Sequence, residues 1–365
     1  MRILIATNQL QHISGSEVVA LEFARYFQSL GHEIELFANW AGPPMSDIVR
    51  ETLGLRIHTK PDPINPTAFD LAYFQHQVAG LFDFTAVQGS KPATAIVMGR
   101  LARRSFIESG GWLHDNLLAD RVLANSPLTL EHLQKVGSVA PASTFHNAAP
   151  AAFFRPGFQP SPTLRRILFI TNYDDPAVLG AARLLRAGYE VLHVGRTGSG
   201  ERMVTPELVF GSDVVVTMGK SVQYALASRT PVFVYDHYGG PGYLDPRSRE
   251  LAARFSFSGR CCERRLSAEA LAAEIVDEHP VGVAFARTCT DAWLSRFHLS
   301  GHLDELLATP PRSNAERRDT VMRHPFLQQE RMLAWHVRKT YIEKMKLRAS
   351  VEDLRRRLES AGVQS

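Results

Sequence analysis

The sequence predicts an α/β protein with two doubly wound, Rossmann-like domains, each built on a mostly parallel sheet covered by helices. Its 365 residues are too many for one hydrophobic core and enough for two such domains. Short apolar runs typical of buried parallel strands alternate with helical segments as far as about residue 310. A proline- and alanine-rich stretch, Ala148 to Pro162, divides this series and predicts the connection between the domains.

The first predicted domain, residues 1–155, opens with the apolar run Arg2–Thr7 and a helix that begins at Ser16 and stops at Gly31. Such a strand–helix–strand order starts a doubly wound sheet, because parallel neighbours need a helical crossover. Five later strands are expected in this domain: Glu33–Ala38, Leu71–Phe74, Thr94–Met98, Arg121–Ala124 and Thr144–His146.

The second predicted domain, residues 156–312, repeats the rhythm. Asp174 and Asp175 precede Pro176 and are expected to cap a helix, Ala177–Ala187. Four strands are expected here: Arg166–Thr171, Glu190–Gly195, Val214–Val216 and Pro231–Tyr235. Beyond residue 312 the pattern is helical, and we expect residues 313–345 to pack back on the first domain and residues 346–365 to form a basic amphipathic tail.

Composition excludes several classes of protein. The chain is 45% hydrophobic and 21% charged, as expected of a globular protein. Cys261, Cys262 and Cys289 form no CxxC pair, so neither a disulfide framework nor a zinc site is predicted. The apolar start is too short for a signal-peptide core, and no run of about 18 apolar residues occurs. We therefore expect a cytoplasmic protein, able to lie peripherally at the inner face of a membrane, without metal or cofactor.

The net charge of +4 is concentrated at one end of the chain. Residues 312–359 contain 13 Lys or Arg and 7 Asp or Glu, so the rest of the chain, which forms the two main domains, has a small negative net charge. A nucleic-acid-binding protein is expected to show a basic face on its main domains. No nucleic-acid partner is predicted.

The segment Asp213–Leu244 contains the most informative pattern for binding. A buried strand leads into Gly219-Lys220-Ser221, and the next strand leads into Gly239-Gly240-Pro241-Gly242. Ligands bind open α/β sheets at the carboxyl ends of neighbouring parallel strands. Backbone N–H groups and a lysine at a helix N-terminus suit a phosphate, and glycines let the backbone approach a ligand. The spacing lacks the first glycine of an ATPase phosphate loop, because Val214 stands there.

Three further positions are candidates for the same ligand. Gly15-Ser16 opens the first helix and is expected to meet the same phosphate-bearing ligand from the other domain, although a helix cap alone would also explain it. Asn172 follows the first strand of the second domain. Arg196 follows the next strand and suits a phosphate or a base, with a plain surface arginine as the alternative.

Four segments in this order resemble the GT-B glycosyltransferases, and most closely the bacterial family-4-like retaining group. They read MRILIATN with SGSE, RVLANSPLTLEHLQKVG, FHNAAPAAFFRPG and DVVVTMGKSVQYALASRTPVFVYDHYGG. The resemblance covers about residues 1–310. It implies transfer of a sugar from a nucleotide-diphosphate sugar to a hydroxyl of a glycan, lipid-linked or small-molecule acceptor, in bacterial cell-surface glycan or glycoconjugate biosynthesis.

One position departs from that family. Tyr224 stands where a glutamate usually holds the donor ribose, and Val216 stands where its companion glutamate would be. A tyrosine hydroxyl can still contact a ribose, so Tyr224 remains a donor-binding candidate. The loss of the carboxylate favours a second hypothesis, a non-catalytic GT-B-like protein that binds a sugar nucleotide, a glycan or a partner. A sugar-nucleotide epimerase on the same fold is a third.

The catalytic base has two candidates. His76 follows the strand Leu71–Phe74 and points to the cleft if that strand is parallel to the first. Asp115 is the rival, and a structural role is the alternative for both. A retaining transferase needs mainly electrostatic stabilisation of the leaving diphosphate.

Two basic stretches are candidates for a membrane or a partner. Arg100, Arg103 and Arg104 alternate with apolar residues, which suits a membrane surface or a lipid-linked acceptor as well as a solvated face. A second stretch in the tail has 4,3,4,3 spacing typical of a short coiled-coil seam, and it predicts self-association or membrane contact. This seam comprises Leu347, Val351, Leu354, Leu358 and Ala361.

Overall fold

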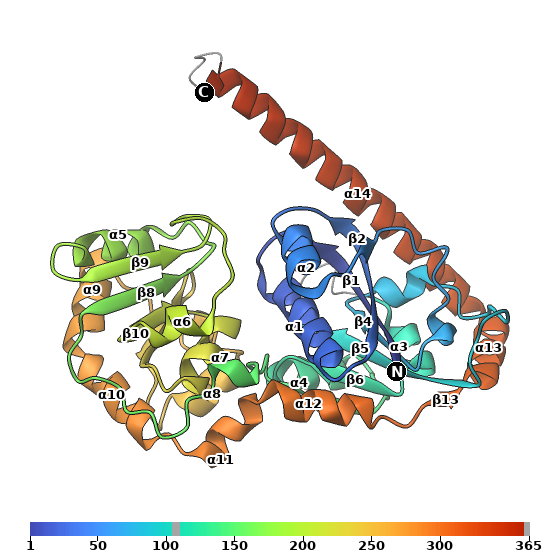
Figure 1. Cartoon of the computed structure of the whole chain (residues 1–365), viewed down its shortest axis with the longest axis horizontal. Helices are drawn as coiled ribbons and strands as arrows, with labels where there is room; N and C mark the ends of the chain where they lie inside the picture. The colour runs from blue at the N-terminus through green and yellow to red at the C-terminus, as the bar shows by residue number, and fades with distance from the viewer. Residues whose placement is uncertain (104–109, 361–365) are drawn as a thin grey trace.

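The computed structural model describes residues 1–103 and 110–360. Two α/β lobes lie side by side, the first in blue and cyan and the second in green and yellow, joined by segments that run beneath both (Figure 1). Each lobe contains its own, mostly parallel sheet. The predicted α/β class with two Rossmann-like domains is therefore confirmed.

Among the described residues, the sheet of the first domain has eight strands. Its order is β3-β2-β1-β4-β5-β6-β7, and every neighbouring pair on this path is parallel. The late strand β13 (Arg312–Ser313) pairs antiparallel with β5. The other strands are β1 (Arg2–Leu10), β2 (Glu33–Ala41), β3 (Ile57–His58), β4 (Leu71–Gln75), β5 (Ala93–Arg100), β6 (Arg121–Ala124) and β7 (Ala142–Thr144).

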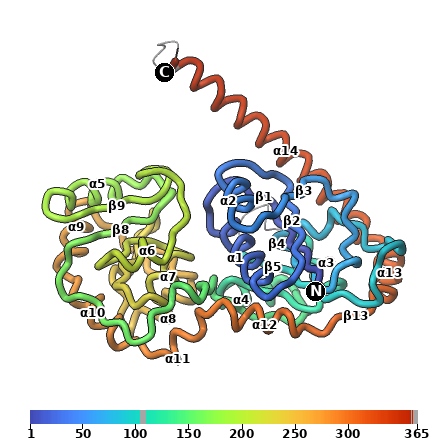
Figure 2. The backbone as a smooth tube through the Cα atoms, viewed as in Figure 1, coloured from blue at the N-terminus to red at the C-terminus, as the bar shows by residue number. Residues whose placement is uncertain are grey.

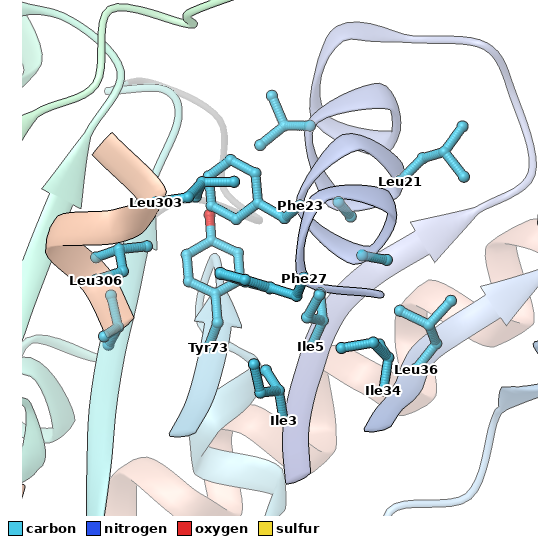
Figure 3. Packing of buried hydrophobic residues seen from close by; sticks show 14 of the residues in the cluster. Ile3, Ile5, Leu21, Phe23, Phe27, Ile34, Leu36, Tyr73, Leu303 and Leu306 are labelled. Atoms are coloured by element: carbon cyan, nitrogen blue, oxygen red, sulfur yellow. The ribbon is translucent and has the colours of Figure 1, made fainter. Parts of the chain in front are cut away.

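The core of this domain joins α1 to the sheet and to a helix from much later in the chain. Phe23 and Phe27 point from α1 (Gly15–Ser29) onto the sheet, and the ring of Phe23 lies 5.0 Å from that of Tyr73. Leu303 and Leu306 approach the same cluster from α12 (Leu299–Leu307), as Figure 3 shows. The other helices of this part are α2 (Met45–Leu53), α3 (Trp112–Leu118) and α4 (Pro127–Lys135), with 3-10 turns η1 (Pro66–Ala68) and η2 (Val78–Leu81).

In the part of the chain that the structure describes, the sheet of the second domain has five strands in the order β12-β11-β10-β8-β9, and only β12 is antiparallel to its neighbour. Asp175 accepts the N–H of Val178 at 3.0 Å and caps α5, as expected. The strands are β8 (Arg166–Ile170), β9 (Glu190–Val194), β10 (Val214–Thr217), β11 (Val232–Asp236) and β12 (Gly239–Tyr243). The helices are α5 (Pro176–Leu185), α6 (Pro206–Phe210), α7 (Lys220–Ala227), α8 (Arg249–Arg254), α9 (Ala268–Asp277), α10 (His279–Thr288) and α11 (Asp291–Leu294).

The chain crosses between the domains twice, at adjacent points. Ala149 donates its N–H to Phe297 O at 2.7 Å and accepts that of Leu299 at 3.0 Å. His146 and Asn147, just before the first crossing, have φ of +53° and +49°. The return crossing lies near residue 298, earlier than the predicted boundary at 312, because the leucines of α12 are buried in the first domain.

The last two helices lie against the first domain. α13 (Asn314–Arg323) and α14 (Pro325–Ser360) contact α3, and α14 also contacts η2 and β2. The second half of α14 projects beyond the globular part (Figure 2). Among the described residues, no helix is long and apolar enough to cross a membrane.

Candidate functional site

A cleft of about 540 Å³ lies between the two domains. Its lining comes from segments that follow β1, β5, β6 and β7 in the first domain and β8, β9 and β10 in the second. These are the carboxyl ends of parallel strands, where open α/β sheets bind ligands. Of the predicted residues, the cleft brings together Gly15, Ser16, Asn172, Arg196, Gly219, Lys220, Ser221 and Tyr224.

The N-terminus of α1 borders the cleft with Gly15 and Ser16. The loop before it is fixed by Glu17, whose carboxylate accepts the N–H groups of Gln11 and His12 and the side-chain amide of Gln9. Burial raises the pKa of Glu17. The first N–H groups of a helix lack intrahelical acceptors, so this rigid helix end suits an anionic ligand.

The N-terminus of α7 borders the same cleft from the second domain. Gly219 has φ +61° and ψ −134°, a conformation that favours glycine and turns the chain from β10 into the helix. Its N–H donates to Phe257 O at 3.1 Å. Two helix N-termini, one from each domain, thus line one cleft.

Lys220 does not use its ammonium group as expected. Its Nζ lies 2.7 Å from Glu22 Oε2 on α1, and it donates to the carbonyls of Ala148 at 3.0 Å and Asn147 at 3.3 Å. Lys220 is 8% and Glu22 4% exposed. A buried ammonium requires a counter-charge and acceptors, and this arrangement supplies them within the protein. The side chain therefore points to the domain interface, and a diphosphate contact would compete with Glu22.

Tyr224 is part of the same interface. Its hydroxyl donates to Glu22 Oε1 at 2.5 Å, and its ring stacks on Phe153 with centroids 4.0 Å apart. Burial, followed by the Glu22 carboxylate, raises the pKa of Tyr224 well above its usual value. Sequence reasoning missed Glu22, although one signal was present: it is an acidic residue on the apolar face of α1.

The loop after β9 places two arginines at the cleft, and it contacts the first domain. Arg196 Nε lies 3.2 Å from Glu201 Oε1, and the backbone N–H of Arg196 donates to Asn172 Oδ1 at 3.2 Å. Asn172 in turn donates to the carbonyl of Ile13 across the cleft at 3.2 Å. Arg202, which sequence reasoning missed, is exposed and lines the cleft.

The segment Gly239–Gly242 forms the start of strand β12 and not the expected loop. It is not among the residues that line the cleft. A Cβ at Gly239 would lie 2.1 Å from Arg264 O, and one at Gly240 would lie 2.1 Å from Val234 O. The glycines are thus required by close packing of β12 against the Arg264 segment and β11. The predicted donor contact of Gly239, Gly240, Pro241 and Gly242 has no support in this geometry.

His76, the candidate base, lies outside the cleft lining. It is 4% exposed, has φ +70°, and its Nε2 lies 3.3 Å from Gln75 Nε2. Gln75 is itself bonded to Thr7 and to the carbonyl of Ser16, so this cluster supports the start of α1 from beneath. His76 follows β4 at the edge of the sheet, as predicted. It does not reach the cleft, because its side chain is buried behind the N-terminus of α1.

Asp115 and Arg100 form a buried ion pair. Both Asp115 oxygens accept from Arg100, at 2.8 Å each, and both residues are 1% exposed. The Trp112 ring lies 4.6 Å from the guanidinium carbon. Burial raises the pKa of Asp115. Arg100 is therefore not a membrane-facing cation, and Asp115 is not available as a base. Arg104, from the same predicted basic stretch, lies outside the described residues.

Among the residues that the structure describes, no group of three or more His, Cys, Asp or Glu side chains is arranged to hold a metal ion.

Comparison with known proteins gave structural likenesses alone. No family model and no curated protein sequence matches the chain. Similar solved structures include the lipopolysaccharide outer core galactosyltransferase WaaB in its apo form. Its sequence identity is 12%, and the match covers 84% of this chain and 99% of that chain with a TM-score of 0.47. MurG of Acinetobacter baumannii is 11% identical in sequence, and the match covers 84% of this chain and 99% of that chain with a TM-score of 0.47. The S. aureus MnaA–UDP structure is 11% identical in sequence, and the match covers 84% of this chain and 95% of that chain with a TM-score of 0.48.

Proposed function

We propose that the cleft binds a nucleotide-diphosphate sugar and that the protein transfers the sugar to a hydroxyl acceptor. The observation that carries this proposal is the convergence of two helix N-termini, at Gly15 and Gly219, with Arg196 and Arg202 around one cleft. Helix N-termini and arginines both favour a diphosphate, through N–H donors and charge-assisted hydrogen bonds. The acceptor is a glycan, a lipid-linked sugar or a small molecule, in bacterial surface-polysaccharide or glycoconjugate biosynthesis at the cytoplasmic side.

The chemistry proposed is transfer with retention, without a metal ion. The positive helix ends and arginines would stabilise the leaving diphosphate, which is the main requirement of such a reaction. The leaving phosphate would accept the proton of the acceptor hydroxyl, so no protein base is assigned. This assignment agrees with the burial of His76 and Asp115 away from the cleft.

A second candidate function is sugar-nucleotide binding without catalysis. It is favoured by the Glu22 contacts, because Lys220 and Tyr224 are both engaged by that carboxylate and not directed to a ligand. Both functions require the same diphosphate site, so binding and turnover must be measured separately.

Binding is tested by calorimetry and thermal shift with uridine, adenosine and guanosine mono- and diphosphates and their sugar derivatives. One nucleotide diphosphate should stabilise the protein by about 2.7 kcal/mol at 100 times its Kd. Arg202→Ala and Arg196→Ala should each weaken that binding by about 1.5–3 kcal/mol, and more for the diphosphate than for the monophosphate. The control is Arg247→Ala, because the Arg247 side chain is 94% exposed and lies outside the cleft.

Turnover is tested by release of nucleoside diphosphate from the sugar nucleotide that binds, with hydroxyl acceptors added. Release supports the transferase. Binding without release supports the second function. If no nucleotide or sugar nucleotide stabilises the protein, or if the arginine variants bind as tightly as the control, the diphosphate site is wrong.

A further inference from the structure

The helix α14 changes its apolar face where it leaves the globular part. Leu327, Ala334, Tyr341 and Met345 are buried, and the first three repeat every seven residues on the side of the helix that faces the first domain. Continued along the helix, the same side carries Arg348, Glu352 and Arg355, which are exposed. Charged residues there show that the helix is not built to dock further on its own domain.

A second apolar row begins at the same point. Leu347, Val351, Leu354 and Leu358 are spaced by 4, 3 and 4 residues and are 68%, 47%, 57% and 49% exposed. Ala361, the fifth residue expected in this row, lies outside the described residues, so the name seam is kept below for these four residues. The seam lies about 135° around the helix from the docked side, by the rotation of about 100° per residue. A partner on the seam would therefore approach α14 from a direction that its own domain does not occupy.

We propose that the seam pairs with that of a second copy of this chain as a parallel two-stranded coiled coil. The seam has the a/d spacing of such a structure, and a two-fold pairing places identical residues together. In the parallel alignment, Glu343 faces Arg348 of the second copy, and Ser350 faces Arg355, so neither of these two flanking contacts joins like charges. In the antiparallel alignment, Arg348 faces Arg355, and like charges repel.

A membrane surface fits the seam less well. An interfacial helix has a broad apolar face opposite a cationic one, whereas this seam is two residue rows wide. Residues 346–360 contain three acidic residues beside five basic ones. Two heptads bury little surface, and short helices are unstable alone, so the dimer should be weak and concentration-dependent. The inference is independent of the activity proposed for the cleft.

The test is the mass of the full chain by light scattering and sedimentation over a range of micromolar concentrations. The wild-type protein should form a dimer as concentration rises. Leu347→Ser with Leu354→Ser should raise the dimer Kd about a hundredfold, because four leucines leave the contact. The matched control is Val139→Ser, which changes a side chain that is 78% exposed and distant from α14 in sequence. Equal thermal melts of all variants would show that the fold is retained.

Orientation is tested by charge exchange. Glu343→Arg alone and Arg348→Glu alone each place like charges across the parallel contact and should weaken the dimer about tenfold. An equal mixture of the two variants should restore it, because both contacts then join opposite charges. A monomer at every concentration overturns the proposal, as does a mixture no tighter than its components. Recovery of monomeric protein on vesicles with anionic lipid, abolished by the seam variant, would assign the seam to a membrane instead.

Discussion

Glu22 of the first domain and Lys220 of the second form an ion pair that is buried within the interface between the domains. Nζ and Oε2 are 2.7 Å apart, and the same carboxylate accepts the hydroxyl of Tyr224. The two helices that carry the pair, α1 and α7, are those whose N-termini border the cleft. The pair therefore links the relative position of the two domains to the geometry of the proposed site.

Breaking this ion pair should destabilise the protein strongly. Lys220→Met leaves the Glu22 carboxylate buried without its counter-charge, at a cost of about 3–5 kcal/mol. Glu22→Met combined with Lys220→Met should cost less, because neither charge is left alone. Urea unfolding measures both. A single variant as stable as the wild type, or a double variant less stable than the single, would contradict the role of the pair.

Tyr224→Phe should lower stability by about 1–3 kcal/mol while leaving nucleotide affinity unchanged. The substitution removes the donor to Glu22 Oε1 but keeps the ring that stacks on Phe153. Tyr173→Phe is the control for stability, since Tyr173 is 50% exposed. The measurements are urea unfolding and calorimetry with the nucleotide that binds. A loss of affinity without a loss of stability would show that the hydroxyl serves the ligand.

Asp115→Asn should destabilise the first domain by about 1.5–3 kcal/mol, because it removes the carboxylate that accepts two buried, charge-assisted hydrogen bonds from Arg100. Nucleotide affinity and turnover per folded molecule should remain at the wild-type value, since Asp115 lies outside the cleft. Unfolding and activity are measured on the same preparation. Full stability with lost turnover would restore Asp115 as a catalytic candidate.

Acid should destabilise the protein in part through His146. Burial, followed by the charges of His302 and Arg296, lowers the pKa of His146 to about 4 from 6.5. Between these values the unfolded chain binds a proton that the folded chain does not, so stability is lost as pH falls from about 6.5 to 4, by about 1–3 kcal/mol. His146→Asn should reduce the slope of the free energy of unfolding against pH, measured by urea unfolding at several pH values. Asparagine tolerates the φ of +53° at this position.

The control for that experiment is His336→Asn, on the exposed side of α14. Its slope should match that of the wild type. Some slope should persist in both variants, because burial also lowers the pKa values of His193 and His279. If His146→Asn leaves the whole slope intact, His146 is not among the groups that cause it.

Local sequence was sufficient for the elements and for part of the site. The apolar runs and helix caps predicted β1, α1, β8 and α5 closely, because those signals lie within a few residues of each element. The helix N-termini at Gly15 and Gly219 lie at the cleft, and the sequence could indicate this because a strand–turn–helix order fixes where a helix begins.

Side-chain partners could not be predicted from local pattern. Lys220 is held by Glu22, which is almost 200 positions away, and only the packing of the two domains brings them together. Arg100 appeared to belong to a basic surface stretch, but Asp115 and Trp112 enclose it. The glycines at 239–242 suit a ligand loop and a tightly packed strand equally, and the deciding neighbour is Arg264.

The return of the chain to the first domain has a consequence for the order of folding during synthesis. Leu303 and Leu306 complete the core beside α1, and Arg317, buried through contacts with Asp120 and Asn314, secures β13 beside β5. These residues emerge from the ribosome only after the whole second domain. The second domain is a continuous segment and is able to finish folding first, although domains that begin a chain ordinarily do so. The earlier half of the first domain must therefore wait, with part of its apolar core uncovered, until residues near 320 have been made.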